Sequence, residues 1–70
     1  MTAPARTFRI LRGPAAPVCA VYYKTAAARD AAAARFAKLD GQNVALEEWS
    51  LDHPQDELNA GWACTGAVYA

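Results

Sequence analysis

The sequence predicts an α+β fold, in which a single ββαββ domain has a four-stranded, mostly antiparallel sheet with one helix packed on one face. Three observations predict it: alternating apolar and polar runs in both halves of the chain, an alanine-rich stretch between them, and Gly or Pro at the breaks. We expect residues 7–70 to form this domain. Residues 1–6 offer little to bury and should form a flexible N-terminal arm.

The first two elements should be strands that pair as a hairpin. In residues 7–12, Phe8 and Ile10 alternate with Thr7, Arg9 and Leu11, and the run stops at Gly13. Residues 18–24 are rich in β-branched and aromatic side chains, which are typical of strands. The glycine and prolines of residues 13–17 predict the connecting loop.

Residues 26–39 should form the helix, because they are dominated by strong helix formers. Thr25 can cap the first turn, and Gly41 suits the left-handed position just past the last. The expected apolar stripe consists of Ala28, Ala32, Phe36 and Leu39, while Arg29, Asp30, Arg35 and Lys38 should lie elsewhere on the helix surface.

Two further strands should follow the helix. Residues 43–51 alternate until Glu47 and Glu48, where the blurred pattern predicts a bulge. The acidic connection that follows should fold Leu58 back onto the core. Residues 62–69 predict the last strand, in which Gly66 marks a bulge or a close approach by another chain.

One helix covers only one face of a sheet, so the other face and both edges should remain open. Neighbours on a strand point to opposite sides. One of Tyr22 and Tyr23, and one of Trp49 and Trp62, should therefore lie on the uncovered face. Exposed aromatic side chains on a small sheet indicate an interface.

Length and composition exclude several classes of protein. Seventy residues suffice for one domain, and no apolar run approaches the roughly 18 residues of a membrane span. The first residues lack the features of a secretory signal, which leads us to expect a cytoplasmic protein.

The inventory of reactive side chains is too small to predict an enzyme. The chain has one histidine, His53, and one serine, so Cys64 with His53 is the main conceivable pair. Neither cysteine has a second Cys or His at metal-ligand spacing, and no glycine-rich loop leads into a helix. We expect no catalytic residues, no metal, no cofactor and no small-molecule substrate.

The two cysteines leave two possibilities open. Cys19 and Cys64 would face each other if the second and fourth strands were close, and oxidation would then close a long loop. A reducing compartment would instead keep them as two buried free thiols.

Charge is divided unevenly along the chain although the net charge is zero. Residues 1–39 hold all seven basic groups and a single acid, a formal charge of +6. Residues 40–70 hold six acids and no base, a formal charge of −6. The chain is therefore polarised, which suits association with a surface of opposite potential.

These observations favour a small non-catalytic binding or regulatory protein that acts on a protein partner, as a homodimer or as an inhibitor or adaptor, through an exposed sheet face and edge. The expected interface residues are Tyr22, Tyr23, Trp49 and Trp62. The alternative is a nucleic-acid-binding module that uses Arg6, Arg9, Arg12, Arg29, Arg35 and Lys38. Against that alternative, Arg9 or Arg12 can pair across the sheet with Glu47 or Glu48. An ordinary monomer with a solvated dipolar surface is the third possibility.

Overall fold

The structure is a computed structural model that describes residues 3–12 and 19–70. Its elements run β1 (Phe8–Arg12), β2 (Cys19–Tyr23), α1 (Ala26–Asp40), β3 (Val44–Trp49) and β4 (Trp62–Val68). The expected α+β fold with ββαββ order is confirmed. The expected hairpin loop at residues 13–17, Val18 at the start of the second expected strand, and residues 1–2 of the expected arm lie outside the described residues.

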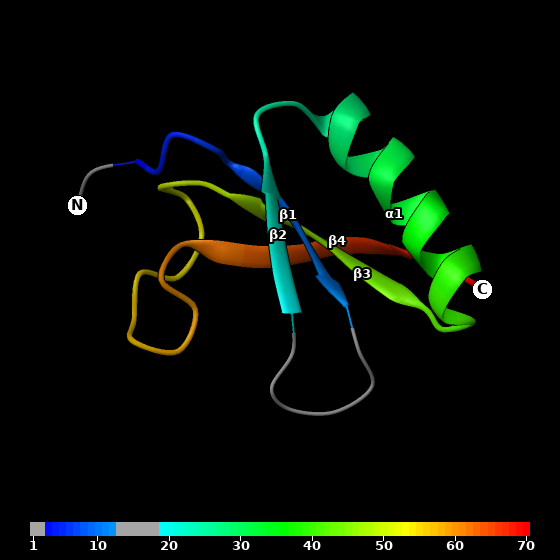
Figure 1. Cartoon of the computed structure of the whole chain (residues 1–70). Coiled ribbons are helices and arrows are strands. Elements are labelled where there is room, and N and C mark those ends of the chain that lie inside the picture. The colour runs from blue at the N-terminus through cyan, green and yellow to red at the C-terminus, as the bar shows by residue number, and fades with distance from the viewer. Residues whose placement is uncertain (1–2, 13–18) are drawn as a thin grey trace.

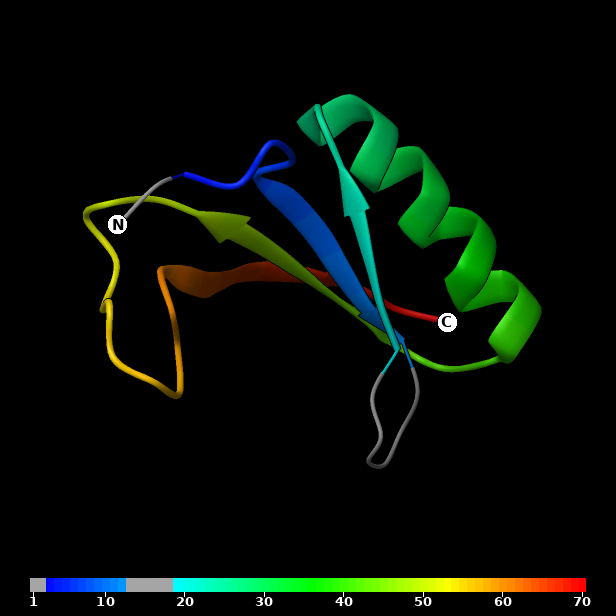
Figure 2. The same ribbon diagram turned by 60° about the vertical axis from the view of Figure 1, so that its left-hand side comes forward.

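The sheet is antiparallel throughout, with the strand order β2-β1-β3-β4. The strands β1 and β3 are therefore central, and β2 and β4 form the two edges. The helix α1 lies across one face of the sheet, and no second layer covers the other face among the described residues (Figures 1 and 2). The two-layer arrangement follows from a chain with a single helix, which can cover only one face of the sheet.

The core is small and lies between α1 and the two central strands. Ile10 and Val44 are the largest fully buried side chains, and Ala33 and Ala37 of α1 pack against them. The register places Ile10 opposite Val21 on one side and Leu46 on the other, which gives the sheet an apolar row beneath the helix. The partly buried side chains that surround this core are Val21, Tyr23, Phe36, Leu46 and Val68.

Both ends of α1 are capped as the sequence predicts. The Ala28 N–H donates to Thr25 Oγ1 at 3.2 Å, which satisfies a donor of the first turn. Gly41 has a φ of 66° and its N–H donates to the Ala37 carbonyl at 3.0 Å, as in a left-handed helix end.

The expected apolar stripe of α1 is wrong in part, because the helix is rotated from the predicted orientation. Ala28 is exposed and Leu39 is 77% exposed, whereas Arg29 is only 7% exposed. The buried residues of the helix are Arg29, Ala32, Ala33 and Ala37. Alanine fills positions 31–34, so the sequence pattern alone could not decide which of these positions face the sheet.

An irregularity interrupts the pairing of β3 with β4 at the position where a bulge was expected. Leu46 pairs with Gly66 while the next residue, Glu47, pairs with Cys64. The extra residue is therefore Thr65, on β4 rather than on β3, next to the glycine that also predicted a bulge.

The connection from β3 to β4 is a folded loop of residues 50–61 with turns and no helix. Its two ends are joined because the Ser50 N–H donates to the Gly61 carbonyl at 3.0 Å. The expectation that Leu58 folds onto the core is wrong, since its side chain is 91% exposed. Asp56 instead holds the tip by accepting from the backbone N–H of Asn59, three residues on, at 2.7 Å, as a capping side chain does.

No helix of the described residues has the length and apolar character needed to cross a membrane.

Candidate protein interface on the open sheet face

The face of the sheet opposite α1, here called the open face, carries a row of side chains that crosses all four strands. Arg9 is directly opposite Tyr22 in β2 and Glu47 in β3, and Glu47 is opposite Cys64 in β4. Directly opposite residues of antiparallel strands share a face. Since Ile10, the neighbour of Arg9, is buried beneath α1, this row lies on the open face.

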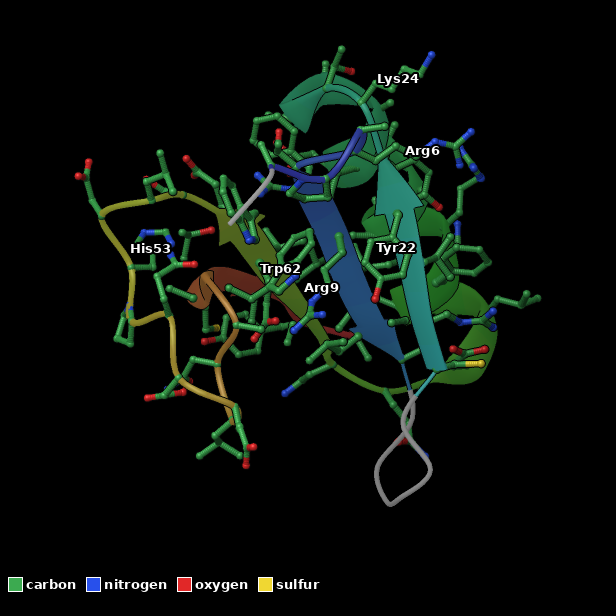
Figure 3. The ribbon with its side chains drawn as sticks, turned by 90° about the vertical axis from the view of Figure 1, so that its left-hand side faces the viewer. Arg6, Arg9, Tyr22, Lys24, His53 and Trp62 are labelled. Atoms are coloured by element: carbon green, nitrogen blue, oxygen red, sulfur yellow. The ribbon has the colours of Figure 1, made fainter. Side chains whose placement is uncertain are left out.

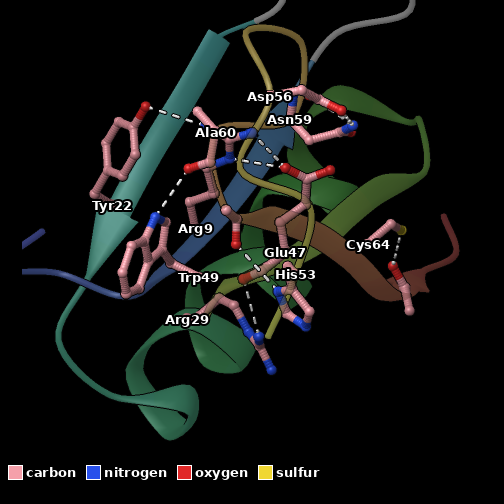
Figure 4. Close-up of polar contacts among 12 residues, drawn as sticks. Arg9, Tyr22, Arg29, Glu47, Trp49, His53, Asp56, Asn59, Ala60 and Cys64 are labelled. Carbon is pink, nitrogen blue, oxygen red and sulfur yellow. Dashed lines mark hydrogen bonds and ion pairs between the residues drawn. The ribbon is translucent and has the colours of Figure 1, made fainter. Parts of the chain in front are cut away.

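Arg9 and Glu47 form an ion pair at the centre of this row. The Arg9 Nη2 lies 2.6 Å and its Nε lies 2.8 Å from Glu47 Oε1 (Figure 4). The two side chains are 20% and 14% exposed, so the pair is partly shielded from water. The internal pairing weighed against nucleic-acid binding is confirmed for Arg9, and it neutralises the guanidinium within the chain.

Two aromatic rings enclose the Arg9 guanidinium. Its Cζ lies 4.2 Å from the ring centroid of Trp62 and 5.9 Å from that of Tyr22. The two rings themselves meet edge to face, with centroids 5.6 Å apart and planes at 65°. Arg9 Nη1 also donates to the Tyr22 hydroxyl at 3.4 Å. Figure 3 shows these three side chains together on the open face.

Trp62 belongs to the edge strand β4, and Tyr22 belongs to the opposite edge strand β2. Their rings can meet only because both side chains reach toward each other over the two central strands, β1 and β3. Together with Arg9 and Glu47 they form one connected group, here called the open-face cluster. A cation held between two aromatic rings and a carboxylate restricts the motion of all four side chains.

A second row on the open face is uncharged and consists of three alanines and one leucine. Its members, in the order of the strands, are Ala20, Leu11, Ala45 and Ala67. Ala20 and Ala67 are exposed, while Leu11 and Ala45 are half-buried. The open face therefore combines a low, flat platform with the bulkier open-face cluster beside it.

The four expected interface aromatics have different environments. Tyr22 is 40% exposed and Trp62 is half-buried, and both are in the open-face cluster. Tyr23 packs against the core on the helix side. Trp49 is only 9% exposed, and its indole Nε1 donates to the Ala60 carbonyl at 2.9 Å. The structure thus brings together Tyr22 and Trp62, one from each expected pair.

Sequence reasoning did not assign Arg9 and Glu47 to the protein interface. The signal that could have found them is the strand register, since Arg9 lies opposite both Tyr22 and Glu47. That register depends on how the two hairpin partners and β3 align, which a single sequence does not fix.

Three of the six basic residues proposed for nucleic-acid binding are engaged within the chain. Besides Arg9, the Arg12 guanidinium makes two bonds to the Asp40 carboxylate, at 2.8 and 3.0 Å, and lies 3.8 Å from the Phe36 ring centroid. The hydrogen bond from Arg12 lowers the pKa of the Asp40 carboxyl below its usual range. Arg29 is buried, and its Nη1 donates to the backbone carbonyl of Glu47 at 3.2 Å.

The other three basic residues, Arg6, Arg35 and Lys38, are exposed. None of the three ion pairs formed by the described part of the chain includes them. Arg6 precedes β1, whereas Arg35 and Lys38 belong to α1 on the opposite side of the sheet. They do not form a continuous basic track together with Arg9.

Cys64 and His53 bond to backbone groups rather than to each other. Cys64 Sγ lies 3.4 Å from the Gly66 carbonyl, and His53 Nδ1 lies 3.1 Å from the Gly61 carbonyl (Figure 4). A carbonyl oxygen only accepts, so His53 must carry a proton on Nδ1. Within residues 3–12 and 19–70, no three Cys, His, Asp or Glu side chains gather as metal ligands and no pocket is present.

The hypothesis of a disulfide between Cys19 and Cys64 is wrong, and so is the expectation that both thiols are buried. Both cysteines are free and exposed. They lie on β2 and β4, at opposite edges of the sheet with β1 and β3 between them. Three strand spacings amount to about 14 Å, whereas a disulfide needs Cα atoms within about 7 Å.

Comparison of the chain with protein-family models, with curated proteins and with solved structures finds no significant match in any of the three.

Proposed function

We propose that this protein is a small non-catalytic binding protein that engages a protein partner through the open face of its sheet. The observation that carries the proposal is the open-face cluster, in which Tyr22 and Trp62 enclose the Arg9 guanidinium and Glu47 neutralises it. Tyr, Trp and Arg are the side chains most enriched among residues that dominate protein–protein binding.

The chemistry of the open face suits a protein better than a nucleic acid. The Arg9 guanidinium on this face is paired with Glu47. It could neutralise a phosphate, and so release the counterions of that phosphate, only by breaking this ion pair. The neighbouring row from Ala20 to Ala67 is uncharged and mostly alanine, which lets another apolar surface approach closely. A partner with a flat or extended apolar segment fits such a platform.

Preorganisation supports the same conclusion. A side chain that is ordered on binding costs about 0.5–1.5 kcal/mol. Tyr22 and Trp62 already contact each other and Arg9, which reduces the conformational freedom that they would lose on binding a partner. The half-buried and exposed members of the open-face cluster then supply apolar area to a partner.

Site-specific photo-crosslinking in the cells of origin tests the proposal. A benzophenone side chain is placed at Ala20, which is exposed on the open face beside Tyr22, and in a control at Ala34, which is exposed on α1. We expect a discrete protein adduct from position 20 that is absent from position 34 and is lost when Tyr22→Ala is added.

The same experiment separates the alternatives. Adducts to RNA or DNA from position 20 would favour the nucleic-acid module. The absence of any adduct, or the same adduct from both positions, would overturn the proposal. Circular dichroism of each variant establishes that a lost adduct does not come from unfolding.

A further inference from the structure

The edge strand β4 points to a specific additional partner. We infer that two copies of this chain pair antiparallel through β4 about a two-fold axis, which joins their sheets into one continuous sheet. The inference concerns the edge of the sheet and goes beyond the proposed binding of a partner on the open face.

The strand β4 has little protection against pairing with another strand. Residues 62–69 contain no charged side chain and no proline, and Cys64, Thr65, Gly66 and Ala67 are exposed. Edge strands of monomeric proteins are usually protected by charges, prolines, bulges or a covering element, and of these β4 has only the single bulge at Thr65 among the described residues. The bulge that leaves Thr65 as the extra residue interrupts the ladder at one point, and the segments 62–64 and 66–68 flank it.

The other edge is a poorer candidate. The strand β2 covers five residues against seven for β4, and Lys24 follows it directly. A lysine beside an edge strand disfavours pairing with a second copy of the same strand.

Opposite charges lie at the two ends of β4. Its first residue, Trp62, follows the loop 50–61, where Asp52, Asp56 and Glu57 are exposed. Its last residue, Val68, packs against the buried core cluster, which includes Ala37 from the C-terminal half of α1. Figure 1 shows the loop at one side of the molecule and the end of α1, with the end of β4, at the other.

The basic residues Arg35 and Lys38 lie in that same half of α1 and are exposed. In a two-fold antiparallel arrangement, the Trp62 end of each β4 lies beside the Val68 end of the other. The acidic loop of each copy then lies on the same side as the basic helix end of its partner. A parallel arrangement would bring like charges together.

Charge complementarity therefore favours a second copy of this chain as the occupant, and it favours the antiparallel orientation. The two-fold axis of such a pair is perpendicular to the sheet, so both helices lie on one side. The two open faces then form one surface on the other side, with an open-face cluster in each half.

Sedimentation equilibrium of the purified chain under reducing conditions tests the inference. We expect a monomer–dimer equilibrium between about 1 and 200 µM, with a Kd that rises at least several-fold when the salt concentration rises from about 0.05 to 0.5 M. A wild-type chain that stays monomeric throughout this range would overturn the inference.

Two charge variants locate the contact. Thr65 is the middle residue of β4, so in a two-fold pair centred on this strand Thr65→Lys and Thr65→Glu each place like charges near the axis, and each alone should raise the Kd by more than about tenfold. An equimolar mixture of the two should restore the dimer. Ala20→Lys, on the β2 edge, should leave the Kd unchanged.

The outcomes against the inference are equally specific. A dimer that survives both Thr65 variants, or one that Ala20→Lys disrupts instead, would overturn pairing through β4. This failure is distinguishable from failure of the proposed function, because the adduct from position 20 depends on Tyr22 and the homodimer does not.

Discussion

Gly61 and Gly41 have left-handed backbones but different surroundings. Gly61 has a φ of 86°, and a Cβ added to it would lie 2.4 Å from Nε1 of the Trp49 indole. Gly41 has a φ of 66°, and nothing lies within 4 Å of an added Cβ. The two positions therefore separate the cost of the backbone conformation from the cost of a steric clash.

We expect Gly41→Ala to lower the free energy of unfolding by about 1 kcal/mol, which is the cost of a left-handed non-glycine residue. Gly61→Ala should lower it by about 2–4 kcal/mol, because displacement of the Trp49 indole adds to the backbone term. Urea denaturation of both variants measures the difference. Equal costs at the two positions would contradict the close packing of Trp49 on Gly61.

Glu47 holds the Arg9 guanidinium between the two rings, and its loss should affect stability. Glu47→Gln leaves a partly buried arginine without a charged partner and should lower the free energy of unfolding by about 1–2 kcal/mol. The matched control is Glu57→Gln, at an exposed position, which should change it by less than about 0.5 kcal/mol. Thermal or urea unfolding measures both, and a neutral Glu47→Gln would contradict the role of the ion pair.

Two exposed carboxyl groups make stability depend on pH. The hydrogen bond from Arg12 lowers the pKa of Asp40, and the backbone and side-chain N–H groups of Asn59 lower that of Asp56. A carboxyl whose pKa is lower in the folded state stabilises the fold above its unfolded pKa of about 3.9, and this contribution is lost as the pH falls through the folded-state value.

We therefore expect the unfolding temperature to fall as the pH drops below about 4. Asp40→Asn and Asp56→Asn should each make this fall shallower, since each removes one of the linked groups. Differential scanning calorimetry between about pH 2 and 6 measures the effect. An unchanged slope in both variants would contradict the lowered pKa values.

At the scale of single elements, α1 depends on small side chains for its close approach to the sheet. Ala33 is fully buried against Ile10 and Val44, whereas Ala34 is exposed. Ala33→Leu should lower the free energy of unfolding by about 1–3 kcal/mol through overpacking. Ala34→Leu should change it by less than about 0.5 kcal/mol, because leucine is nearly as good a helix former as alanine. Similar effects in urea denaturation would contradict the orientation of the helix.

The same helix shows what could and could not be predicted from the sequence. Composition and caps determined its existence and ends, and both are confirmed at Thr25 and Gly41. Its rotation could not be predicted, because consecutive alanines give no apolar period. Arg29 is buried for a reason that composition does not show: its guanidinium lies 5.2 Å from the Phe8 ring centroid and donates to the Glu47 carbonyl.

The strands show the same division between local and long-range information. Their alternating patterns predicted the element order, and an irregularity beside Glu47 was expected from the blurred pattern. The strand order depends on contacts between distant segments. The central position of β1, which separates the two cysteine-bearing strands and brings Arg9 beside Glu47, could not be predicted from local pattern.

At the scale of the whole molecule, the polarised charge of the sequence is partly cancelled within the fold. Two of its three ion pairs in the described residues, Arg9 with Glu47 and Arg12 with Asp40, join the basic half of the chain to the acidic half. Among the charged groups that remain exposed, acidic ones lie on the loop 50–61 and basic ones lie on α1. This arrangement underlies the proposed pairing of two copies through β4.

The uncovered second face is the other feature of the whole molecule. A single helix on a four-stranded sheet leaves Tyr22 and Trp62 on the side without a second layer. Alternation assigns one of Tyr22 and Tyr23 to this face, but it does not separate Trp49 from Trp62, which the register places directly opposite each other. We propose that this face binds a protein.

Native mass spectrometry of the tagless chain, purified gently from its own cells under reducing conditions, tests that claim most directly. We expect the wild type and Tyr69→Ala, an exposed aromatic outside the open-face cluster, to retain an added protein mass beyond multiples of the 7.5 kDa chain, and Tyr22→Ala to lose it. A wild type that carries no mass other than its own, or an added mass that Tyr22→Ala retains, would contradict the claim.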